Sequence, residues 1–537
     1  MKVRHLIVSI FLLCSSSVYA WSQHQSLAWV SSHTPAGTAL AHHELLAQIY
    51  HGNQYQPIWY QYDAIKQFEA QLEHAALADV SDVFYHRLSE LKEARYQNRW
   101  QEYDILATDT LLTFMSYSQL AQKEGKGWFF GGRVPAHLPM PEEGSTEALL
   151  FAVENDGLQA YLEQYEPNTA AFKKYVTTID KLKPYVDFFV SDYMQRKHLL
   201  RKGDRITHKP ELTYRLDILG FDVQHIDQSN KIYDGDLELV VKQFQQRHGL
   251  SVDGVIGPKT IYWINRPMEE RLRLVALNAQ RLRIWPEQRS NIVLVNVPQF
   301  AMTYWKEGQK AFESDVIVGR PSRKTPLINT KMDSVILNPR WNVPRKIMVK
   351  DILPKAIHSQ EYLESHNYEI VKSWHNREVI NPDEIDWTEV NPSSFPYRIR
   401  QLSGPRNALG QYKFNTPNKN AIFLHDTPAK SLFSKDRRAF SSGCIRIEEA
   451  ASFAQLLVEQ SAVKSQFKQM SLPGEDTLAV TLKRRIPVHI IYQTVWFKNG
   501  ELQYSDDVYR YDHLSKSSNF DAKLTKIVNL DKVLSAQ

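Results

Sequence analysis

The sequence has very few cysteines, and this scarcity limits the chemistry that it can carry. Only two occur in 537 residues, Cys14 and Cys444. A fold held by several disulfides, or a zinc site built from several thiolates, is therefore excluded. His42 and His43 are adjacent, but no His-Glu-x-x-His pattern of a zinc hydrolase is present. The sequence predicts neither a metal nor any other cofactor.

A strong charge of one sign is also lacking. The net charge is only +5, and no run of Lys and Arg is long enough to follow a phosphate backbone. We therefore expect no nucleic-acid partner. With 43% hydrophobic residues the chain is too apolar for a disordered protein, and its length is too great for one compact core. Two to four domains are predicted.

Long apolar runs are scarce as well, and the one that matters is at the N-terminus. Lys2 and Arg4 precede an apolar stretch at residues 6–14, and a small-residue site ends at Ala20. This arrangement is typical of a secretory signal, so residues 1–20 are predicted to be a signal peptide and the mature chain to be periplasmic. The stretch is short for a transmembrane helix, and an uncleaved membrane anchor is the less favoured alternative.

Export would leave the chain with one thiol. Cys14 departs with the signal peptide, and bulky Leu13 occupies the place where a small residue would precede a lipidated cysteine. In an oxidising compartment the remaining thiol of Cys444 could form dimers, be buried and inert, or be a protected nucleophile. The residues around it decide between these interpretations.

Apolar periodicity divides the chain into a helical half and a β-rich half, and the predicted fold class is multidomain α+β. The β-rich half is expected to be mostly antiparallel, and a charged segment that interrupts it is expected to be a lid or an added, helical capping subdomain. The predicted parts after the signal are a helical scaffold domain (21–202), a small three-helix module (203–266), a helical linker (267–290), a catalytic domain (291–515, with the insertion at 345–400) and a C-terminal tail (516–537).

Shorter patterns predict individual elements. In the module, helices are expected at residues 212–221, 237–248 and 259–265, with Gly220 and Gly249 ending the first two. Glu307-Gly308 and Asn499-Gly500 are hairpin turn signals. Strands are expected at residues 292–297, 301–305, 312–318, 334–337, 421–424 and 488–496.

The module also carries an ordered set of motif residues. Each of its glycines can be explained alone by a turn or a helix cap. In combination, the motif resembles the peptidoglycan-binding module, and wall binding is what that resemblance implies. The residues that carry it are Phe244-Gln245, His248-Gly249-Leu250, Asp253-Gly254 and Gly257-Pro258-Lys259-Thr260.

A histidine and a cysteine lie in a pattern that favours acyl transfer. An apolar stretch leads to His425, and the glycine-flanked Cys444 follows 444 − 425 = 19 residues later. A free thiol is only a few per cent thiolate at neutral pH, and His425 could serve both as its base and as a cationic neighbour. The N–H groups of Gly443 and Cys444 could hold an oxyanion. Arg446 could pair with a substrate carboxylate or with an acid of the fold.

This pattern resembles the catalytic motif of L,D-transpeptidases with the YkuD-type fold. That motif usually has a glycine after the first histidine and a second histidine before Gly-Cys; here Asp426 and Ser442 stand at those places. The second histidine's role is then absent or filled otherwise. Stretches 341–344 and 404–410, with Lys413, resemble the segments that flank this active site. The resemblance implies Cys444 as nucleophile and His425 as base, with oxyanion or substrate contacts from Ser441, Ser442, Gly443, Arg446, Asp426, Phe423, Trp341 and Asn407.

The resemblance extends over nearly the whole mature chain, to the large enterobacterial-type members of that family. It implies a thioester acyl-enzyme that joins the diaminopimelate residues of a donor tetrapeptide stem and an acceptor stem of peptidoglycan. Carbapenem inhibitors would acylate the same sulfur, and other wall-synthesis enzymes are further candidate partners. Two alternatives stay open at this point: a wall-binding scaffold protein without turnover, and a related acyl transfer that attaches a lipoprotein to peptidoglycan or hydrolyses cross-links.

Overall fold

The computed structural model describes residues 24–186, 199–285, 289–461, 476–512 and 520–535. The predicted signal peptide lies outside these ranges. Within them, no helix combines the length and the apolar character needed to cross a bilayer. The chain forms two compact units: one contains residues 1–287, 495–504 and 510–537, and the other contains residues 288–494 and 505–509. We describe each unit by itself, and the domain boundaries drawn above stay predictions.

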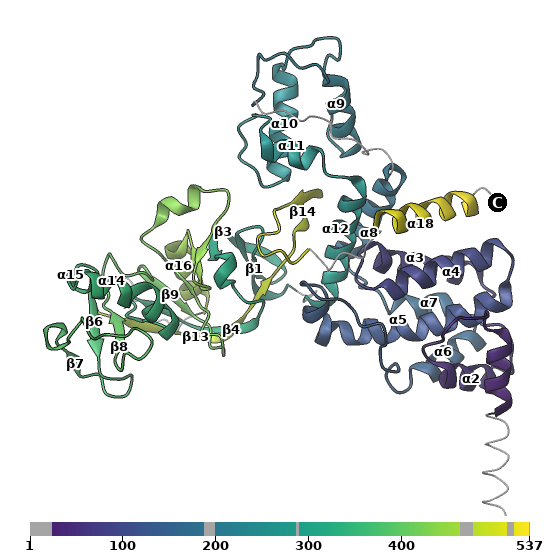
Figure 1. The fold of residues 1–537 in the computed structure, drawn as a ribbon, viewed down its shortest axis with the longest axis horizontal. Coiled ribbons are helices and arrows are strands. Elements are labelled where there is room, and N and C mark those ends of the chain that lie inside the picture. Colours follow the sequence, from purple (N-terminus) through teal and green to yellow (C-terminus); the bar gives the residue numbers. More distant parts are fainter. Residues whose placement is uncertain (1–23, 187–198, 286–288, 462–475, 513–519, 536–537) are drawn as a thin grey trace, which may run out of the picture. The chain divides into compact units, whose positions relative to one another are not determined.

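The first part of the first unit is helical, as predicted. The 29-residue helix α5 runs through its centre and buries Leu111, Leu112 and Phe114 completely. Two helices begin at side-chain caps: Ser81 accepts from the backbone N–H of Val83, and Thr169 accepts from that of Phe172. The helices are α2 (His43–Gly52), α3 (Tyr62–Leu77), α4 (Asp82–Tyr96), α5 (Trp100–Trp128), α6 (Ser145–Glu154), α7 (Leu158–Glu163) and α8 (Ala170–Leu182) (Figure 1).

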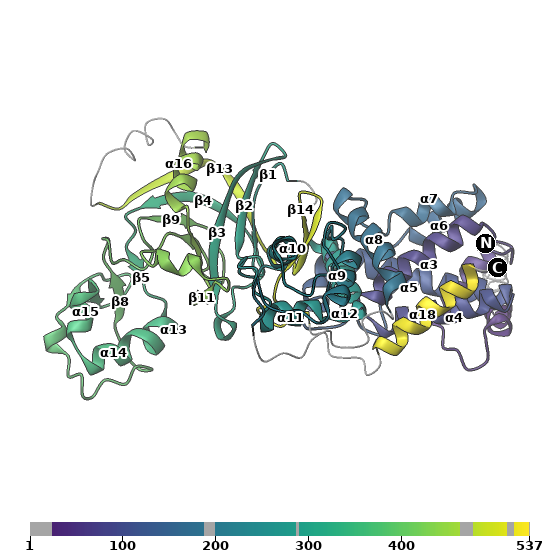
Figure 2. The ribbon, with the colours of Figure 1, turned by 90° about the horizontal axis from the view of Figure 1, so that it is seen from above.

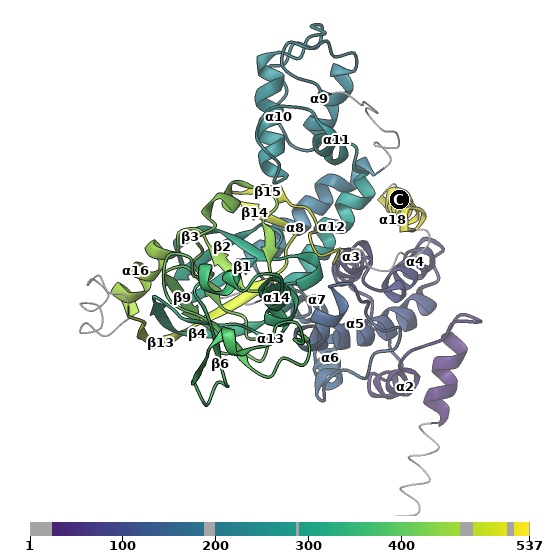
Figure 3. The same cartoon turned by 60° about the vertical axis from the view of Figure 1, so that its left-hand side comes forward.

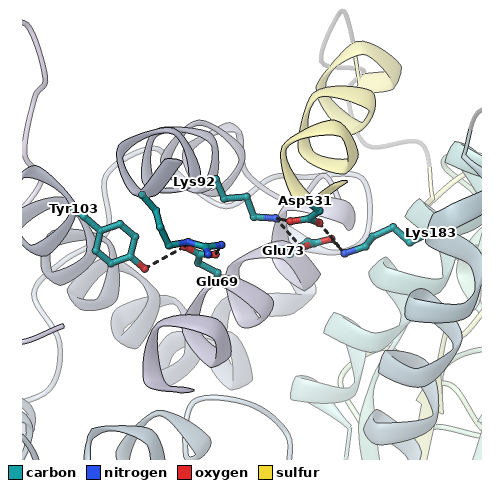
Figure 4. A network of polar contacts seen from close by, with 7 residues as sticks. Glu69, Glu73, Lys92, Tyr103, Lys183 and Asp531 are labelled. Atoms are coloured by element: carbon teal, nitrogen blue, oxygen red, sulfur yellow. Dashed lines mark hydrogen bonds and ion pairs between the residues drawn. The ribbon is translucent and has the colours of Figure 1, made fainter. Parts of the chain in front are cut away.

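The segment predicted as a C-terminal tail contains a helix, α18 (Phe520–Ser535). Its Leu524, Ile527 and Val528 are buried in the scaffold core. Its Asp531 forms ion pairs with Lys92 of α4 and with Lys183, which follows α8 (Figure 4). The last helix is therefore part of the scaffold, although it is more than 300 residues away from α8 in the sequence.

The three predicted helices of the small module are confirmed as α9 (Lys209–Ile218), α10 (Gly235–Arg247) and α11 (Pro258–Ile264) (Figure 3). Gln245 of the Phe-Gln pair has a structural role in the module. The side-chain amide of Gln245 donates to the carbonyl of Val255 at 3.0 Å and accepts from the N–H of Gly254 at 2.8 Å, so it fastens the Asp-Gly turn to α10. The predicted linker helix follows as α12 (Met268–Arg281).

The second unit is built on a nine-stranded sheet in the order β11-β3-β12-β10-β9-β4-β13-β1-β2. Because β2 also pairs with β3, the sheet closes on itself as a barrel. Three pairs are parallel, β1–β13, β10–β12 and β3–β11, and the other pairs are antiparallel, so the predicted antiparallel character holds for most of the sheet. The strands are β1 (Asn291–Asn296), β2 (Ala301–Lys306), β3 (Gln309–Gly319), β4 (Asn329–Leu337), β9 (Tyr412–Asn415), β10 (Leu424–His425), β11 (Ala439–Ser441), β12 (Ile445–Ile447) and β13 (Leu478–Ile491).

Two strand predictions were wrong in part. At residues 421–424 only Leu424 is in a strand, because the side chain of Asn418 bonds the backbone of Ile422 and holds a turn in which Ala421 has φ +53°. The predicted strand at residues 488–496 is two strands. β13 ends at Ile491, and β14 (Val495–Lys498) forms a hairpin with β15 (Glu501–Tyr504) that belongs to the first unit.

The insertion at residues 345–400 has its own hydrophobic core, which includes Met348, Leu353, Ile370, Trp387 and Ile399. This core favours the added subdomain over a simple lid loop. Besides the expected helices it contains a second sheet in the order β5-β8-β6-β7, and it stands beside the barrel strands β4 and β9 (Figure 2). The strand β5 (Trp341–Asn342) directly precedes the insertion, and the elements of the insertion are α13 (Arg345–Ile347), η4 (Met348–Ile352), α14 (Leu353–His358), α15 (Glu361–Ser365), β6 (Tyr368–Val371), β7 (Val379–Ile380) and β8 (Arg398–Gln401).

Candidate active site

Neighbouring barrel strands bring both predicted catalytic residues, His425 and Cys444, to one face of the sheet. In the register, His425 of β10 is opposite Lys413 of β9 and opposite Arg446 of β12. Cys444 directly precedes β12, and the N–H of the next residue donates to the carbonyl of Phe423. Side chains two positions apart point to the same side of a strand. The shared face therefore presents Lys413, Phe423, His425, Cys444 and Arg446.

The opposite face of the same strands is apolar and buried. Phe414, Leu424 and Ile445 alternate with the residues of the candidate site and are almost fully buried. Phe453 of α16 (Ala450–Ser461) packs against the ring of Phe414, with 4.9 Å between the ring centroids. Burial on this side fixes the register, and the register in turn fixes which side chains face the site.

The Cys444 side chain is a free thiol that is partly buried. Its Sγ is 3.8 Å from the carbonyl oxygen of Ala421, and no hydrogen bond joins it to His425. Burial raises the pKa of the Cys444 thiol, while the positive charges of Lys413 and Arg446 oppose that shift. At neutral pH the resting form is therefore the neutral thiol, which must lose its proton during attack.

His425 is buried, with 4% of its surface exposed, and its Nδ1 is 2.5 Å from the carbonyl oxygen of Asp426. A carbonyl only accepts hydrogen bonds, so Nδ1 carries the proton and Nε2 is left as the basic atom. Burial, reinforced by the charge of Arg446, lowers the pKa of His425 to about 3. The imidazole is thus neutral at rest. It can act as the predicted base, but it does not supply the expected positive charge.

Hydrogen bonds of Ser441 shape the loop before the cysteine. Its Oγ donates to the carbonyl of Cys444 at 2.6 Å and accepts from the N–H of Gly443 at 3.0 Å. Gly443 has φ +125°, a conformation that side-chain-bearing residues rarely adopt. The Gly443 amide thus already has an acceptor, whereas the Cys444 amide has none among the described residues. An oxyanion contact from Gly443 would have to replace its bond to Ser441.

The other predicted site residues are less directly placed. Asp426 is buried, pairs with Lys430 at 2.8 Å, and orients His425 through its carbonyl. The amide nitrogen of Asn407 donates to the carbonyls of Pro339 and Leu402, so this side chain organises its own loop. Trp341 lies in β5 and packs on the core of the insertion. Substrate contacts of these residues stay predictions.

Lys413 and Arg446 are two cations of this face that no carboxylate neutralises in the described part of the chain. The ammonium of Lys413 lies over the ring of Phe423, 4.4 Å from its centroid, and burial lowers the pKa of Lys413. The Nε of Arg446 is buried without a hydrogen-bond partner, and burial lowers the pKa of Arg446 too. Of the two open interpretations of Arg446, pairing with an acid of the fold is not what the structure shows.

Sequence reasoning missed the residues that contact Ser442. Its Oγ accepts from Arg323 Nη1 at 2.9 Å and from Arg320 Nη2 at 3.3 Å. The only signal available was the basic segment at residues 320–324, directly after the strand predicted at 312–318. Within the described ranges, no group of three or more His, Cys, Asp or Glu side chains lies close enough to hold a metal ion.

Three segments of the chain match known protein families. Residues 290–464 match the YkuD family, described as the L,D-transpeptidase catalytic domain. Residues 44–178 match a family described as a scaffold domain, and residues 210–264 match one described as "Putative peptidoglycan binding domain". The chain thus carries a β-rich YkuD-type catalytic domain together with a helical scaffold domain and a peptidoglycan-binding module.

A curated relative covers most of the chain. A Haemophilus influenzae protein named "Putative L,D-transpeptidase" is 28% identical over 468 residues, which are 87% of this chain and 78% of that protein. The family match and this relative agree on the class of enzyme.

Solved structures with some similarity include three from the same class. An L,D-transpeptidase from Stackebrandtia nassauensis has a TM-score of 0.22 and 13% identity, over 56% of this chain and 97% of that one. Residues 123–326 of the Xylanimonas cellulosilytica enzyme have a TM-score of 0.18 and 13% identity, over 56% and 100% of the two chains. The "Ldtfm-avibactam carbamoyl enzyme" has 0.18 and 12%, over 39% of this chain and 51% of that one. At these TM-scores the solved structures add nothing to the argument.

Proposed function

With an L,D-transpeptidase catalytic domain at residues 290–464 as the premise, we propose that this protein cross-links peptidoglycan stem peptides through a cysteine thioester. The bond that it forms joins two diaminopimelate residues. The observation that carries the proposal is the register of β10 and β12, which puts the Nε2-bearing ring of His425 and the thiol of Cys444 on one face of the sheet. The chain would then belong to the large enterobacterial-type group known as YcbB or LdtD, and would act in the periplasm after export.

The first half-reaction forms the acyl-enzyme. As the Sγ of Cys444 attacks the carbonyl carbon at the L-centre of diaminopimelate, its proton passes to Nε2 of His425. The bond to the terminal D-alanine then breaks, and the D-alanine amine takes that proton when it departs. A thioester on Cys444 remains. Because the thioester retains much of the energy of the broken peptide bond, no ATP is needed.

The second half-reaction forms the cross-link. The side-chain amine of diaminopimelate in an acceptor stem loses a proton to Nε2 of His425 and attacks the thioester carbon. The C–S bond breaks, and the sulfur recovers the proton from His425. The carbonyl of Asp426 holds the Nδ1–H side of the ring through both steps, so Nε2 keeps facing the reacting atoms.

The charge of the site fits this substrate. Stem peptides carry carboxylates, and the two cations without a carboxylate partner, Lys413 and Arg446, can bind them by charge-assisted hydrogen bonds. The same cations also favour the thiolate of Cys444 as it forms. A carbapenem, which carries both a carboxylate and a reactive acyl group, would acylate Cys444 in this site.

Other parts of the chain would support the reaction. The three-helix module would hold the enzyme on the wall, and the insertion at residues 345–400 would limit access of water to the thioester. Deletion of the insertion tests the second role, because the ratio of hydrolysis to transfer should then rise. An unchanged ratio would remove the capping role and leave the chemistry intact.

The direct test uses purified mature protein and a disaccharide-tetrapeptide. Wild-type protein should form the cross-linked dimer and release D-alanine, and Cys444→Ala should form neither. Arg484→Ala, which changes an exposed residue of β13, is a matched control for a substitution in the same unit. Dimer formation by the Cys444→Ala variant would refute the proposed nucleophile.

The same preparation separates the alternatives. A wall-binding scaffold without turnover would bind peptidoglycan but would gain no mass at Cys444 when a carbapenem is added. An enzyme that attaches a lipoprotein would release D-alanine only when a lysine-bearing peptide is the acceptor. Formation of diaminopimelate-to-diaminopimelate dimers with stems alone is the result that only the proposed function gives.

A further inference from the structure

One short segment holds the backbone on the N-terminal side of the cysteine. The N–H of Arg320 donates to the carbonyl of Ser441 at 3.0 Å, and the hydroxyl of Thr325 donates to the carbonyl of Gly443 at 2.8 Å. The same hydroxyl accepts from the N–H of Gly319 at 2.8 Å, so the segment is tied to the end of β3. The position of the cysteine loop therefore depends on residues 319–325.

Ser442 lies between these two backbone contacts, and its hydroxyl accepts from two side chains of the same segment, from Arg320 at 3.3 Å and more closely from Arg323. Nη1 of Arg323 donates to Ser442 Oγ at 2.9 Å. That guanidinium, with 11% of its side chain exposed, also forms a two-pronged ion pair with Asp351: Nη2 is 2.9 Å from Oδ1, and Nη1 contacts Oδ2. Arg323 thus bonds two partners with one planar group, a geometry that lysine cannot reproduce.

Asp351 belongs to the insertion, in η4 (Met348–Ile352), next to the buried core residues Met348 and Ile352. The hydrogen bonds from Arg323 favour the carboxylate form of Asp351 and lower its pKa. The chain of contacts therefore runs from the core of the insertion through Asp351 and Arg323 to Ser442, two residues before the nucleophile.

We propose that Arg323 is a positioning residue that couples the insertion to the cysteine loop. Asp351 fixes the orientation of the guanidinium, and the guanidinium fixes Ser442 and with it the Gly443–Cys444 peptide. This inference rests on the proposed function, because the reaction is the process that the positioning serves. It also gives Ser442 a defined role at the place where the resembled motif has a histidine.

A purely structural ion pair would behave differently. Asp351 is one-third exposed, and such pairs usually contribute little to stability. If the ion pair only linked two side chains at the surface, its loss would leave the turnover of folded enzyme unchanged. If it positions the loop, its loss lowers kcat while the affinity for substrate is kept.

The test compares full-length mature variants in the stem-dimer assay. Asp351→Asn and Ser442→Ala should each lower kcat about tenfold, the change expected when one charge-assisted hydrogen bond is lost, with KM kept within about twofold. The double variant should be no slower than Ser442→Ala alone, because the effect of Asp351 reaches the loop through the bond between Arg323 and Ser442. Arg323→Lys should lose as much as Asp351→Asn, and Ser442→Thr, which keeps a hydroxyl, should recover part of the rate lost in Ser442→Ala.

The matched control is Glu369→Gln. It breaks the ion pair of Glu369 with Arg400, whose side chains are 17% and 11% exposed, within the sheet of the insertion and without contact to the cysteine loop. This variant should keep the wild-type kcat. An equal loss in Glu369→Gln and Asp351→Asn would show general weakening of the insertion and would overturn the positioning role, as would a wild-type kcat in Asp351→Asn or in Arg323→Lys.

A readout that does not need turnover separates this inference from the proposed function. Hydrogen exchange at residues 441–446 should be faster in Asp351→Asn than in wild type and unchanged in Glu369→Gln. Equal exchange in Asp351→Asn and wild type would refute the coupling even if the enzyme is active. A wild-type protein that forms no dimers would refute the proposed function, and the exchange rates would still decide the coupling.

Discussion

Cations that are partly or fully buried occur in the scaffold and around Cys444, and the two regions treat them in opposite ways. In the scaffold, Lys92 and Lys183 both bond Glu73 of α3 and Asp531 of α18, so that two positive charges meet two negative ones (Figure 4). Around Cys444, Lys413 and Arg446 have no such partners in the described part of the chain. The first arrangement joins helices from distant parts of the sequence, and the second leaves charge available to a ligand.

The pKa shifts of two lysines express this difference. Burial lowers the pKa of both Lys183 and Lys413, because a low dielectric disfavours the charged form. For Lys183 the carboxylates of Glu73 and Asp531 outweigh burial, and its pKa is raised. For Lys413 no group does so, and its pKa is lowered. Lys413 feels the charge of Asp333, but this does not offset burial, so the charged lysine destabilises the folded state and binding an anion would relieve that cost.

After removal of Cys444 itself, the largest expected effect on the active-site side comes from His425→Gln. This variant keeps a polar side chain near the Asp426 carbonyl but has no basic nitrogen. Loss of a general base should lower kcat/KM of dimer formation by about 10²–10⁴-fold. Lys413→Arg, which keeps a positive charge on the same face, is the control and should lose far less. Loss of less than about threefold in His425→Gln would mean that another group takes the proton.

Glu73→Gln should give the largest loss of stability on the scaffold side. It leaves Lys92, which is buried, and Lys183, which is partly buried, with Asp531 alone, and breaking a buried pair on one side costs about 3–5 kcal/mol. Chemical denaturation followed by scaffold tryptophan fluorescence measures this loss. Glu90→Gln, which removes a carboxylate that is 44% exposed and paired with Arg87, should cost at most about 1 kcal/mol. Equal losses in the two variants would mean that burial of the network adds nothing to the free energy of unfolding.

Lys413→Met should not lower the free energy of unfolding, in contrast to Glu73→Gln. Removal of a partly buried cation that forms no ion pair should leave stability unchanged or raise it by about 1 kcal/mol. The same variant should raise the KM of the tetrapeptide donor about tenfold, the effect of one lost charge-assisted contact. With a donor whose terminal carboxylate is amidated, wild type and Lys413→Met should have the same KM if Lys413 binds this carboxylate. If Lys413→Met lost as much stability as Glu73→Gln, the two lysine sites would not differ in the way described.

The dependence on pH should differ between the two regions. The folded-state pKa of His425 is depressed to about 3 from 6.5, so kcat/KM should stay level between about pH 5 and 8 with no acid limb near 6.5. An acid limb near 6.5 would contradict a buried neutral imidazole.

Scaffold stability should respond to pH in the direction set by Glu73. Burial alone would raise the pKa of Glu73, but Lys92 and Lys183 outweigh it and lower the pKa to about 2 from 4.5. A depressed carboxyl pKa gives stability that is present above about pH 4.5 and is lost as the pH falls toward 2. Denaturation midpoints measured from pH 6 to pH 3 check this, and Glu73→Gln should remove most of the dependence.

The sequence allowed prediction of the parts of the site that depend on local pattern. The apolar stretch that leads to His425 and the glycine before Cys444 lie in one short segment, and in the barrel this segment puts both residues on one face of the sheet. The helical module and linker were predictable for the same reason, because their caps and glycines are local signals.

Contacts between distant segments were not predictable. Arg323 meets both Asp351 and Ser442 only because β3, the insertion and the cysteine loop come together in the folded unit. Asn407 looked like a substrate contact, but its amide is used by nearby carbonyls. The place of the C-terminal helix in the scaffold was missed because its Asp531 pairs with Lys92 and Lys183, which lie far from it in the sequence.

The central claim is that Cys444 carries the acyl group. Intact-protein and peptide mass spectrometry of the wild-type protein, mixed with a tetrapeptide donor and no acceptor, tests it most directly. The account predicts a tripeptide-stem adduct, joined by a thioester to the peptide that contains Cys444, together with one equivalent of D-alanine. A donor that is turned over with no adduct at Cys444, or with an adduct at another residue, would contradict it.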